Sequence, residues 1–294
     1  MYASEKYSDD NRVNNLLRKH IFKLALNTIK PIESWLWKIK ILRKPLQIIF
    51  DYSAPDDWLP VEVHGIKIYI NMRCGAVAKS IIQKGTYEEG TTNLFIKSMR
   101  KGAVVIDVGA HCGYYSLIAA KLVGDEGKVF AFEPHPANFK LLKRTISFNM
   151  CNNIIPINKA VGDTIGKTRL FLHTSGQHSI VRKGKKHIQV EVVNLDRFFQ
   201  ENKISPDVIK IDVEGAEILT LKGMDRTLKD SKNLKLFIER GHNEQEIKSF
   251  LAERGFTIYY ITGNGTLLRE PSKKVKLEPN MFAIKQLRAS WLRK

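Results

Sequence analysis

From Ala103 onward, short apolar runs alternate with stretches in which apolar residues recur at helical spacing. The runs have the length of buried strands, and the amphipathic stretches between them have the length of helices. The pattern predicts strands at residues 104–108, 128–132, 154–158, 207–212 and 234–239 and near 256–261 and 280–285, with helices at 113–123, 136–150, 215–229 and 243–254. It therefore predicts an α/β fold with a parallel, doubly wound sheet.

Two alternating segments, at residues 167–172 and 188–194, interrupt this order and predict an inserted β-hairpin. Upstream, two short strands are expected at 61–64 and 66–70, and Thr91 or Thr92 is expected to cap a helix that ends near Met99. The chain is thus divided into an N-terminal extension with a linker (1–55), a strand-and-helix lead-in (56–102), a main domain (103–287) and a basic tail (288–294).

The N-terminal extension is amphipathic and basic. Within residues 12–50, apolar residues recur at helical spacing among lysines and arginines, Pro31 interrupts the run, and Trp35 and Trp37 lie among further lysines. Such a segment can lie in an anionic membrane interface, or it can pack on the catalytic domain or on a second subunit. Packing is the commoner fate of basic amphipathic helices, and both interpretations stay open.

Composition limits the classes of protein that fit. A chain of 294 residues with 43% hydrophobic content can hold one α/β domain with a full core plus an extension. Cys74, Cys112 and Cys151 are far apart and form no Cys-x-x-Cys pair, which argues against a zinc ribbon or a disulfide framework. No run of eighteen uncharged apolar residues occurs. We therefore expect a cytoplasmic protein that is soluble or bound peripherally at the inner face of the membrane.

The chain is strongly basic, with a formal net charge of +18 and a pI near 9.7. Such a balance favours an anionic partner, either nucleic acid or an acidic lipid surface, although a solvated basic surface without a partner is the simpler alternative. Residues 1–50 hold ten Lys and Arg against four acids, so basic charge is concentrated in the extension.

A glycine-containing turn follows the first strand of the main domain. Asp107, Gly109 and Gly113 form the pattern Asp-x-Gly-x-x-x-Gly, and Glu133 ends the next strand. A carboxylate in that position can accept hydrogen bonds from both hydroxyls of a ribose. An acid at the turn suits a cationic, zwitterionic ligand better than a pyrophosphate, which needs bare backbone N–H groups. The turn therefore favours S-adenosylmethionine over a dinucleotide, and methyl transfer over hydride transfer.

Four acids, Asp107, Glu133, Asp212 and Glu239, each close an apolar run, and the carboxyl ends of parallel strands meet at one edge. Lys210, Asp212 and Glu214 alternate in an extended stretch, and a lysine inside an apolar strand needs a carboxylate partner. Asp212 and Glu214 can hold the amino-acid end of the cofactor or deprotonate a hydroxyl. Metal-assisted activation by Asp212 and Glu239 is conceivable, but no spacing demands a metal, and none is predicted.

These motifs resemble the FkbM-type methyltransferase family. The resemblance rests on Asp107-Val-Gly-Ala-His-Cys-Gly-Tyr-Tyr-Ser116, Phe132-Glu-Pro134, Asn149, Lys210-Ile-Asp-Val-Glu-Gly-Ala-Glu217 and, upstream, Gly85-Thr-Tyr-Glu88, and it covers about residues 80–285. It implies a class I methyltransferase with a Rossmann-like sheet, S-adenosylmethionine as the donor, and O-methylation of a hydroxyl on a sugar, glycan or polyketide-type product.

The resemblance also implies roles for single residues. Asp107, Gly109 and Gly113 would meet the methionine part of the cofactor, Glu133 the ribose, and Asp163 the adenine. Glu88, His111, Pro134 and Asp212 complete the expected cofactor set, and Asp212, Glu214 and Glu239 form the catalytic set. Family members commonly carry Asn where His111 stands, and a turn residue is a simpler role for it than a general base. His178, Arg240 and His242 are expected to contact the acceptor.

Three functions are weighed. The favoured one is O-methylation of a saccharide or glycolipid near a membrane. An RNA methyltransferase would explain the net charge and the basic run at 182–186, but the chain shows no Asn-Pro-Pro-Tyr-type element and no separate RNA-binding module. A scaffold that binds a nucleoside without chemistry is disfavoured by the acids at the strand ends.

Overall fold

The computed structural model describes residues 58–285, except 64, 72–73, 174–177 and 273. The predicted basic helices within residues 1–55 and the predicted tail at 288–294 lie outside the described residues. The chain divides into two compact units, one formed by Met1–Val61 and Tyr69–Gly85 and the other by Glu62–Ile68 and Thr86–Lys294. The candidate site belongs to the second unit.

Strands β1 (Trp58–Val63) and β2 (Ile66–Asn71) pair in a two-stranded sheet, which confirms the two short strands expected there. Helix α4 (Ala76–Lys84) was not predicted. It ends at Gly85, whose φ of 73° places it in the left-handed region that glycine tolerates.

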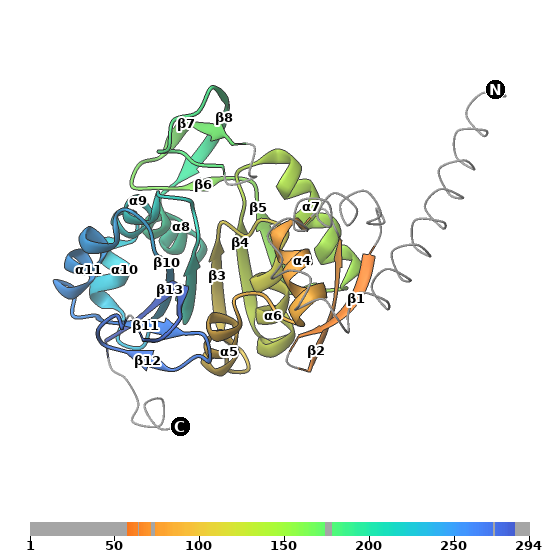
Figure 1. Ribbon diagram of the computed structural model, residues 1–294. Coiled ribbons are helices and arrows are strands. Elements are labelled where there is room, and N and C mark those ends of the chain that lie inside the picture. The colour runs from red at the N-terminus through yellow and green to blue at the C-terminus, as the bar shows by residue number, and fades with distance from the viewer. Residues whose placement is uncertain (1–57, 64, 72–73, 174–177, 273, 286–294) are drawn as a thin grey trace, which may run out of the picture. The chain divides into compact units, whose positions relative to one another are not determined.

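The second unit is built on an eight-stranded sheet in the order β12-β11-β13-β10-β9-β3-β4-β5 (Figure 1). Its parallel part consists of β3 (Val104–Val108), β4 (Lys128–Phe132), β5 (Ile154–Ile157), β9 (Val208–Ile211) and β10 (Lys235–Glu239). The remaining strands, β11 (Thr257–Thr262), β12 (Leu267–Leu268) and β13 (Leu277–Ile284), are antiparallel to their neighbours. The predicted doubly wound α/β sheet is confirmed, with β13 inserted between β10 and β11.

Most predicted helices are found, namely α5 (Glu89–Ser98), α6 (Tyr114–Val123), α7 (Pro136–Phe148) and α11 (Glu244–Ala252). The last three begin and end within two residues of their expected bounds, whereas α5 begins earlier than expected. Helix α7 has proline at its first position, where the missing N–H costs no hydrogen bond. The cap expected from Thr91 or Thr92 is wrong, because Glu88 occupies the N-cap position and the Thr92 hydroxyl donates to the Tyr87 carbonyl instead.

The helix predicted at 215–229 is also wrong as a single element. It is split into α9 (Glu217–Lys222) and α10 (Asp225–Asp230), with Gly223 between them. A Cβ atom at Gly223 would lie 2.1 Å from the Gly162 carbonyl oxygen, so the backbone of the inserted segment passes directly against this junction. The sequence also left helix α8 (Leu195–Asn202) unpredicted.

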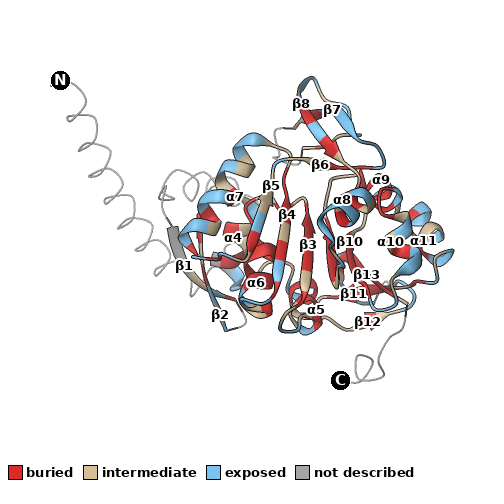
Figure 2. Cartoon of the chain, turned by 180° about the vertical axis from the view of Figure 1, so that it is seen from behind, coloured by how far each residue is buried: buried red, intermediate tan, exposed pale blue. Residues whose placement is uncertain are grey.

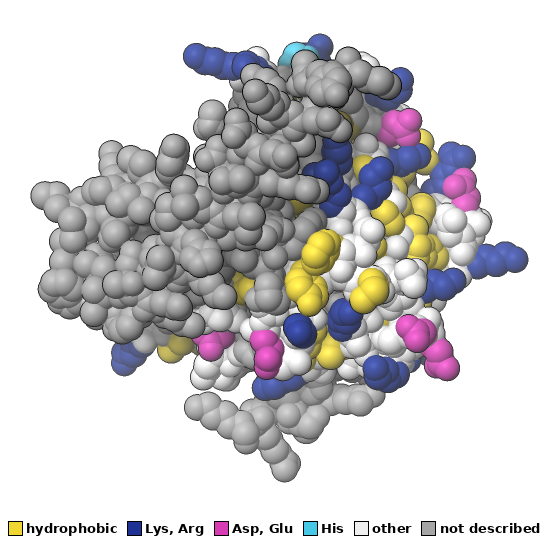
Figure 3. Space-filling model, turned by 90° about the vertical axis from the view of Figure 1, so that its right-hand side faces the viewer, with side chains coloured by type: hydrophobic (Ala, Val, Ile, Leu, Met, Phe, Trp, Pro, Cys, Tyr) yellow, Lys and Arg dark blue, Asp and Glu magenta, His cyan; other side chains and the backbone are white. Residues whose placement is uncertain are grey.

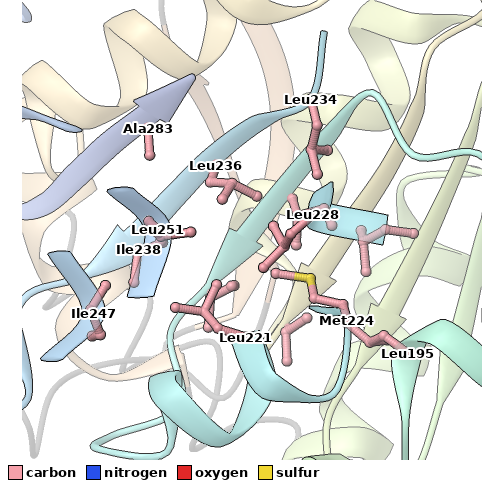
Figure 4. Close-up of a cluster of buried hydrophobic side chains, with 14 of the residues drawn as sticks. Leu195, Leu221, Met224, Leu228, Leu234, Leu236, Ile238, Ile247, Leu251 and Ala283 are labelled. Atoms are coloured by element: carbon pink, nitrogen blue, oxygen red, sulfur yellow. The ribbon is translucent and has the colours of Figure 1, made fainter. Parts of the chain in front are cut away.

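Helices α9, α10 and α11 cover part of the sheet with aliphatic side chains. Figure 4 shows this cluster, which includes Leu221, Met224, Leu228, Leu236, Ile238, Ile247 and Leu251. Burying each such side chain contributes about 1.5–3 kcal/mol. Figure 2 shows buried residues along the central strands and exposed residues on the outward sides of α7 and α11. The strand ends that carry the candidate acids are thus held by a close-packed core.

A three-stranded sheet of order β6-β8-β7 is inserted between β5 and β9. It consists of β6 (Ala160–Val161), β7 (Gly166–Leu172) and β8 (Lys186–Val193), and it confirms the predicted hairpin while adding the two-residue strand β6. One side is apolar, with Leu170, Val190 and Val192 buried. In Figure 1 the inserted sheet lies above the carboxyl ends of the central strands, where ligands bind in folds of this type.

Basic side chains are distributed over the surface. On the face shown in Figure 3, Lys and Arg side chains recur across the described part, with few acidic side chains between them. Within the described segments, the chain forms no helix with the length and apolar character needed to cross a bilayer.

Candidate cofactor and active site

The glycine turn after β3 lies against the end of β9. The backbone N–H groups of Gly109 and Ala110 both donate to the Phe132 carbonyl at 2.9 Å, which joins this turn to β4. Gly109 has φ 85°, and a Cβ atom there would lie 1.8 Å from the Asp212 carbonyl oxygen. Only glycine fits this approach, so Gly109, one of the predicted cofactor residues, allows the turn to pack against the end of β9.

Asp107 lies at the base of the turn, with 3% of its surface exposed. Its Oδ2 accepts a 2.5 Å hydrogen bond from the Ser116 hydroxyl in the first turn of α6. Burial raises the pKa of Asp107 to about 6, although the Ser116 hydrogen bond and the Lys210 charge oppose the shift. The carboxyl group is thus ionised at neutral pH but close to its titration range.

Glu133 joins the two turns that follow β3 and β4. Its Oε2 accepts from the His111 N–H and its Oε1 from the His135 N–H, both at 2.9 Å. Burial raises the pKa of Glu133 to about 7 despite these two hydrogen bonds. The Asn138 side chain also hydrogen-bonds to this carboxylate, whose two oxygens together offer about four lone pairs, so the group can still accept from a ligand hydroxyl. Pro134, half-buried, follows it, and the Asn158 amide donates to the carbonyls of both Glu133 and Pro134.

Lys210 is fully buried in β9 and donates to Asp212 Oδ2 at 2.8 Å. Its ammonium also lies 5.2 Å from the centroid of the Tyr115 ring. Burial alone would lower the pKa of Lys210, but the charges of Asp212 and Glu88 outweigh it and raise the pKa. The expectation that a carboxylate compensates this lysine is therefore confirmed.

Glu88 enters the same network from the start of α5. Its Oε2 accepts from the Tyr115 hydroxyl at 2.7 Å and from the Asn280 amide at 2.8 Å. Asn280 is fully buried and stands opposite Glu239 in the β10–β13 pairing. Asn280 was not predicted from the sequence, in which it is a single amide within the apolar run that ends at Ile284.

The three predicted catalytic acids converge. Asp212, Glu214 and Glu239 each offer one carboxylate oxygen, and these oxygens lie within 4.8 Å of one another. Burial, followed by the charges of Asp212 and Glu214, raises the pKa of Glu239 to about 9, so Glu239 is protonated at neutral pH. Lys210 neutralises Asp212, and the Arg182 guanidinium lies 3.1 Å from Glu214 Oε2. The set could hold a divalent cation, and the absence of a metal stays a prediction.

The turn between β9 and α9 is stabilised by the side chain of the residue that begins α9. Glu217 is 2% exposed, and its Oε1 accepts from the backbone N–H groups of Val213 and Gly215 at 3.3 and 3.0 Å. Glu214, between them, has φ 54°, which is uncommon for a residue with a side chain. The acid that closes the Asp212–Glu217 motif thus shapes the turn, a role that the sequence analysis did not assign.

His178, predicted to contact the acceptor, lies beside His135. The two ring centroids are 4.1 Å apart, and His178 Nδ1 accepts from the His173 N–H at 3.3 Å. Burial, and then the neighbouring charges of His135 and His111, lower the pKa of His178 to about 4. Since His135 follows Glu133 by two residues, the neutral His178 ring lies close to the ribose side of the candidate site.

Of three further predicted site residues, one has other partners in the structure and two lie exposed at the surface. Arg240 donates to Glu244 Oε2 at 2.9 Å and lies over the Tyr260 ring. His242 is exposed, and so is Asp163, in the connection between β6 and β7. Their contacts with acceptor or adenine therefore stay predictions.

The sheet order, the glycine turn and the acids at the carboxyl ends of β3, β4, β9 and β10 define a class I methyltransferase of Rossmann-like fold. The sequence model of the methyltransferase FkbM domain matches residues 107–258, which is more than half of the 294-residue chain. The chain belongs to this methyltransferase family, and the resemblance drawn from its motifs is confirmed.

Two curated relatives are similar to this chain. The hexuronic acid methyltransferase AglP of Haloferax volcanii is 25% identical over 170 residues, which cover 56% of this chain and 68% of AglP. The methyltransferase sdnD of Sordaria araneosa is 23% identical over 165 residues, which cover 44% of this chain and 63% of sdnD.

Among solved structures, the methyltransferase FkbM from Methylobacillus flagellatus KT aligns with a TM-score of 0.45 at 16% identity. The alignment covers 63% of this chain and 44% of that protein, so this chain spans less than half the length of that relative.

Proposed function

We propose that this chain uses S-adenosylmethionine to O-methylate a hydroxyl group of a sugar, glycan or glycolipid. The observation that carries the proposal is the convergence of two carboxylates, Asp107 and Glu133, on the glycine turn directly beside the three-acid cluster. Similarity to AglP, which is named for methylation of a hexuronic acid, supports a saccharide acceptor over RNA.

The donor groups at the turn fit this cofactor. S-adenosylmethionine carries a sulfonium and an ammonium group, and Asp107, Glu88 and Asp212 face them with a single compensating cation, Lys210. Glu133 presents oxygen lone pairs to the ribose hydroxyls. When bound, the cofactor supplies a methyl group on a positively charged sulfur.

The acids differ in their protonation states at neutral pH, and this difference decides which of them can accept a proton. Glu239 is already protonated at neutral pH, so it cannot accept a proton, whereas Asp212, whose pKa is lowered, remains available as an acceptor, with Glu214 as the second candidate. Lys210 and burial act on Asp212 in opposite directions, with the net result that the pKa of Asp212 is lowered. A carboxylate of low pKa takes the hydroxyl proton late, as the acceptor oxygen gains the methyl group. Holding that oxygen in line with the methyl group is therefore the larger contribution of these residues.

Calorimetry tests the cofactor assignment. S-adenosylmethionine should bind the wild-type chain, and Asp107→Asn and Glu133→Gln should each weaken binding by about tenfold or more, since each removes a charge-assisted hydrogen bond. Glu253→Gln, which neutralises an exposed carboxylate that has no assigned role in the site, serves as the matched control. Binding of NAD in place of S-adenosylmethionine would contradict the assignment.

The acceptor class is tested with labelled donor and fractionated glycans, lipids and RNA from cells. Label is expected in the glycan or glycolipid fraction and should be lost in the Asp212→Asn variant. Label found in RNA alone would reject the saccharide acceptor while leaving the methyltransferase assignment in place.

A further inference from the structure

The connection between β7 and β8 carries a dense group of cations. Arg182, Lys183, Lys185 and Lys186 are all exposed, and no acid lies between His178 and His187. Arg182 pairs with Glu214, whereas Lys183, Lys185 and Lys186 make no salt bridge within the described segments of the chain. We call residues 182–186 the basic connection.

The basic connection is anchored to the catalytic turn. The Ser179 hydroxyl donates to the Glu214 carbonyl at 2.8 Å, and Ser179 Oγ in turn accepts from the backbone N–H groups of Val181 and Arg182. The Arg182 side chain then reaches Glu214 Oε2 at 3.1 Å. A Cβ atom at Gly215 would lie 3.3 Å from the Val181 side chain, so this side chain also packs against the turn.

This anchoring distinguishes the basic connection from an ordinary solvated charge run. The Asp212 and Glu214 carboxylates at the active site would repel an anionic acceptor, and the cations beside Glu214 offset that repulsion where the acceptor enters. Arg182 also presents a planar set of donors suited to a carboxylate or phosphate. By contrast, Lys167 and Arg169 lie on the exposed side of β7 and do not belong to the connection anchored at Glu214.

We propose that the methyl acceptor carries an anionic group, a carboxylate or a phosphate, close to the hydroxyl that is methylated, and that Arg182, Lys183 and Lys185 bind this group. The inference rests on the proposed function and narrows its substrate class. In this arrangement the hydroxyl lies at Asp212 and Glu214. The anionic group lies about the length of one side chain away, at the connection between β7 and β8 of the inserted sheet (Figure 1).

Calorimetry with three matched probes tests the inference on the chain saturated with S-adenosylhomocysteine. The probes are methyl glucoside, methyl glucuronoside and methyl glucoside 6-phosphate. At least one anionic probe should bind about tenfold more tightly than the neutral glucoside at low salt, and the preference should shrink as salt screens the charges. The two anionic arms separate carboxylate from phosphate recognition.

The Lys183→Gln, Lys185→Gln double variant should lose most of that preference. The matched control, Lys167→Gln with Arg169→Gln, removes the same number of charges from the exposed side of β7 and should keep it. Equal binding of all three probes, binding of none, or an equal loss in both variants would overturn the inference. If one of these results is obtained while the wild-type chain still binds S-adenosylmethionine, only the anionic acceptor is refuted. If the wild-type chain does not bind S-adenosylmethionine at all, the proposed function itself is refuted.

Discussion

Three acidic or imidazole side chains of the site, Glu88, His111 and Glu214, stand on left-handed backbone, with φ of 44°, 50° and 54°. Residues with side chains adopt this region at a cost in free energy, and such strain collects where a site must aim a group. Asn, Asp and His tolerate the region better than most residues. The left-handed backbone of the turn thus suits histidine at position 111 and would suit asparagine there as well.

His111→Asn should therefore be a mild substitution. If the residue serves the turn, its N–H still reaches Glu133, and both S-adenosylmethionine affinity and turnover should stay within about threefold of wild type, because asparagine tolerates the same backbone. His111→Val, which is β-branched, should lower the melting temperature. Loss of turnover in His111→Asn with cofactor affinity unchanged would instead make the imidazole a base.

Cofactor affinity should depend on pH through Glu133 and Asp107. Burial raises their pKa values to about 7 and about 6, and only the ionised forms accept hydrogen bonds with both oxygens. Affinity should thus fall as the pH drops from 8 to 5.5. Protonation of one group lowers the affinity about tenfold once the pH is one unit below its pKa, and Glu133 reaches this point within the range. Calorimetry across this range, with Glu133→Gln as the variant of flatter dependence, measures the effect. A flat profile in the wild type would contradict the assignment.

Glu239 should reduce stability as the pH rises. Its pKa of about 9 in the folded chain lies above the unfolded value, so the stability it contributes is fully present below about pH 4.5 and is lost as pH rises through 9. Glu239→Gln removes this dependence, and between pH 5 and pH 8 the variant should gain more than about 1 kcal/mol relative to wild type. Urea denaturation at both pH values measures the gain. Glu253→Gln, at an exposed position, should show none.

At the scale of an element, the turn after β3 is the most demanding piece of backbone in the site. Gly109→Ala should cost about 3 kcal/mol or more, because the new methyl group collides with the Asp212 carbonyl in addition to the left-handed strain. Gly102→Ala is the matched control, since Gly102 has φ 71° but no atom within 4 Å of a Cβ, and about 1 kcal/mol is expected there. Denaturant unfolding compares the two, and similar losses would show that the close approach is unimportant.

Elements whose boundaries depend on local pattern were predicted well. Strands β3 and β4 begin and end at the predicted residues because each is a run of five mostly apolar residues bounded by turn or loop residues. The break at Gly223 could not be predicted, because it is imposed by the Gly162 carbonyl, a contact between residues distant in sequence. The two-residue strand β6 is likewise defined only by its partner β8.

The candidate site divides in the same way. Asp212, Glu214 and Glu239 were expected together because parallel strands end at one edge, and the structure brings their oxygens within 4.8 Å. Asn280 was missed because its role depends on β13 entering the sheet beside β10, an arrangement that no local pattern encodes. The anchoring of the inserted sheet by Ser179 was missed for the same reason.

At the scale of the whole molecule, we propose that the basic extension binds an anionic membrane. Residues 1–50 carry ten Lys and Arg against four acids, and each cation near an anionic surface contributes about 1 kcal/mol. The full chain should therefore float with vesicles that contain phosphatidylserine, and a chain lacking residues 1–50 should not. Vesicles of phosphatidylcholine alone are the control for charge. Equal flotation of both chains would reject this role.

The insertion of β13 between β10 and β11 has a consequence for biosynthesis. A ribosome releases the five parallel strands first, yet β10 must wait for a neighbour that is made some forty residues later. Until Asn280 emerges, Glu88 lacks its amide partner and the sheet presents an open edge of the kind that chaperones can cover. The Glu88 side of the candidate site is thus completed only after β13 has been synthesised.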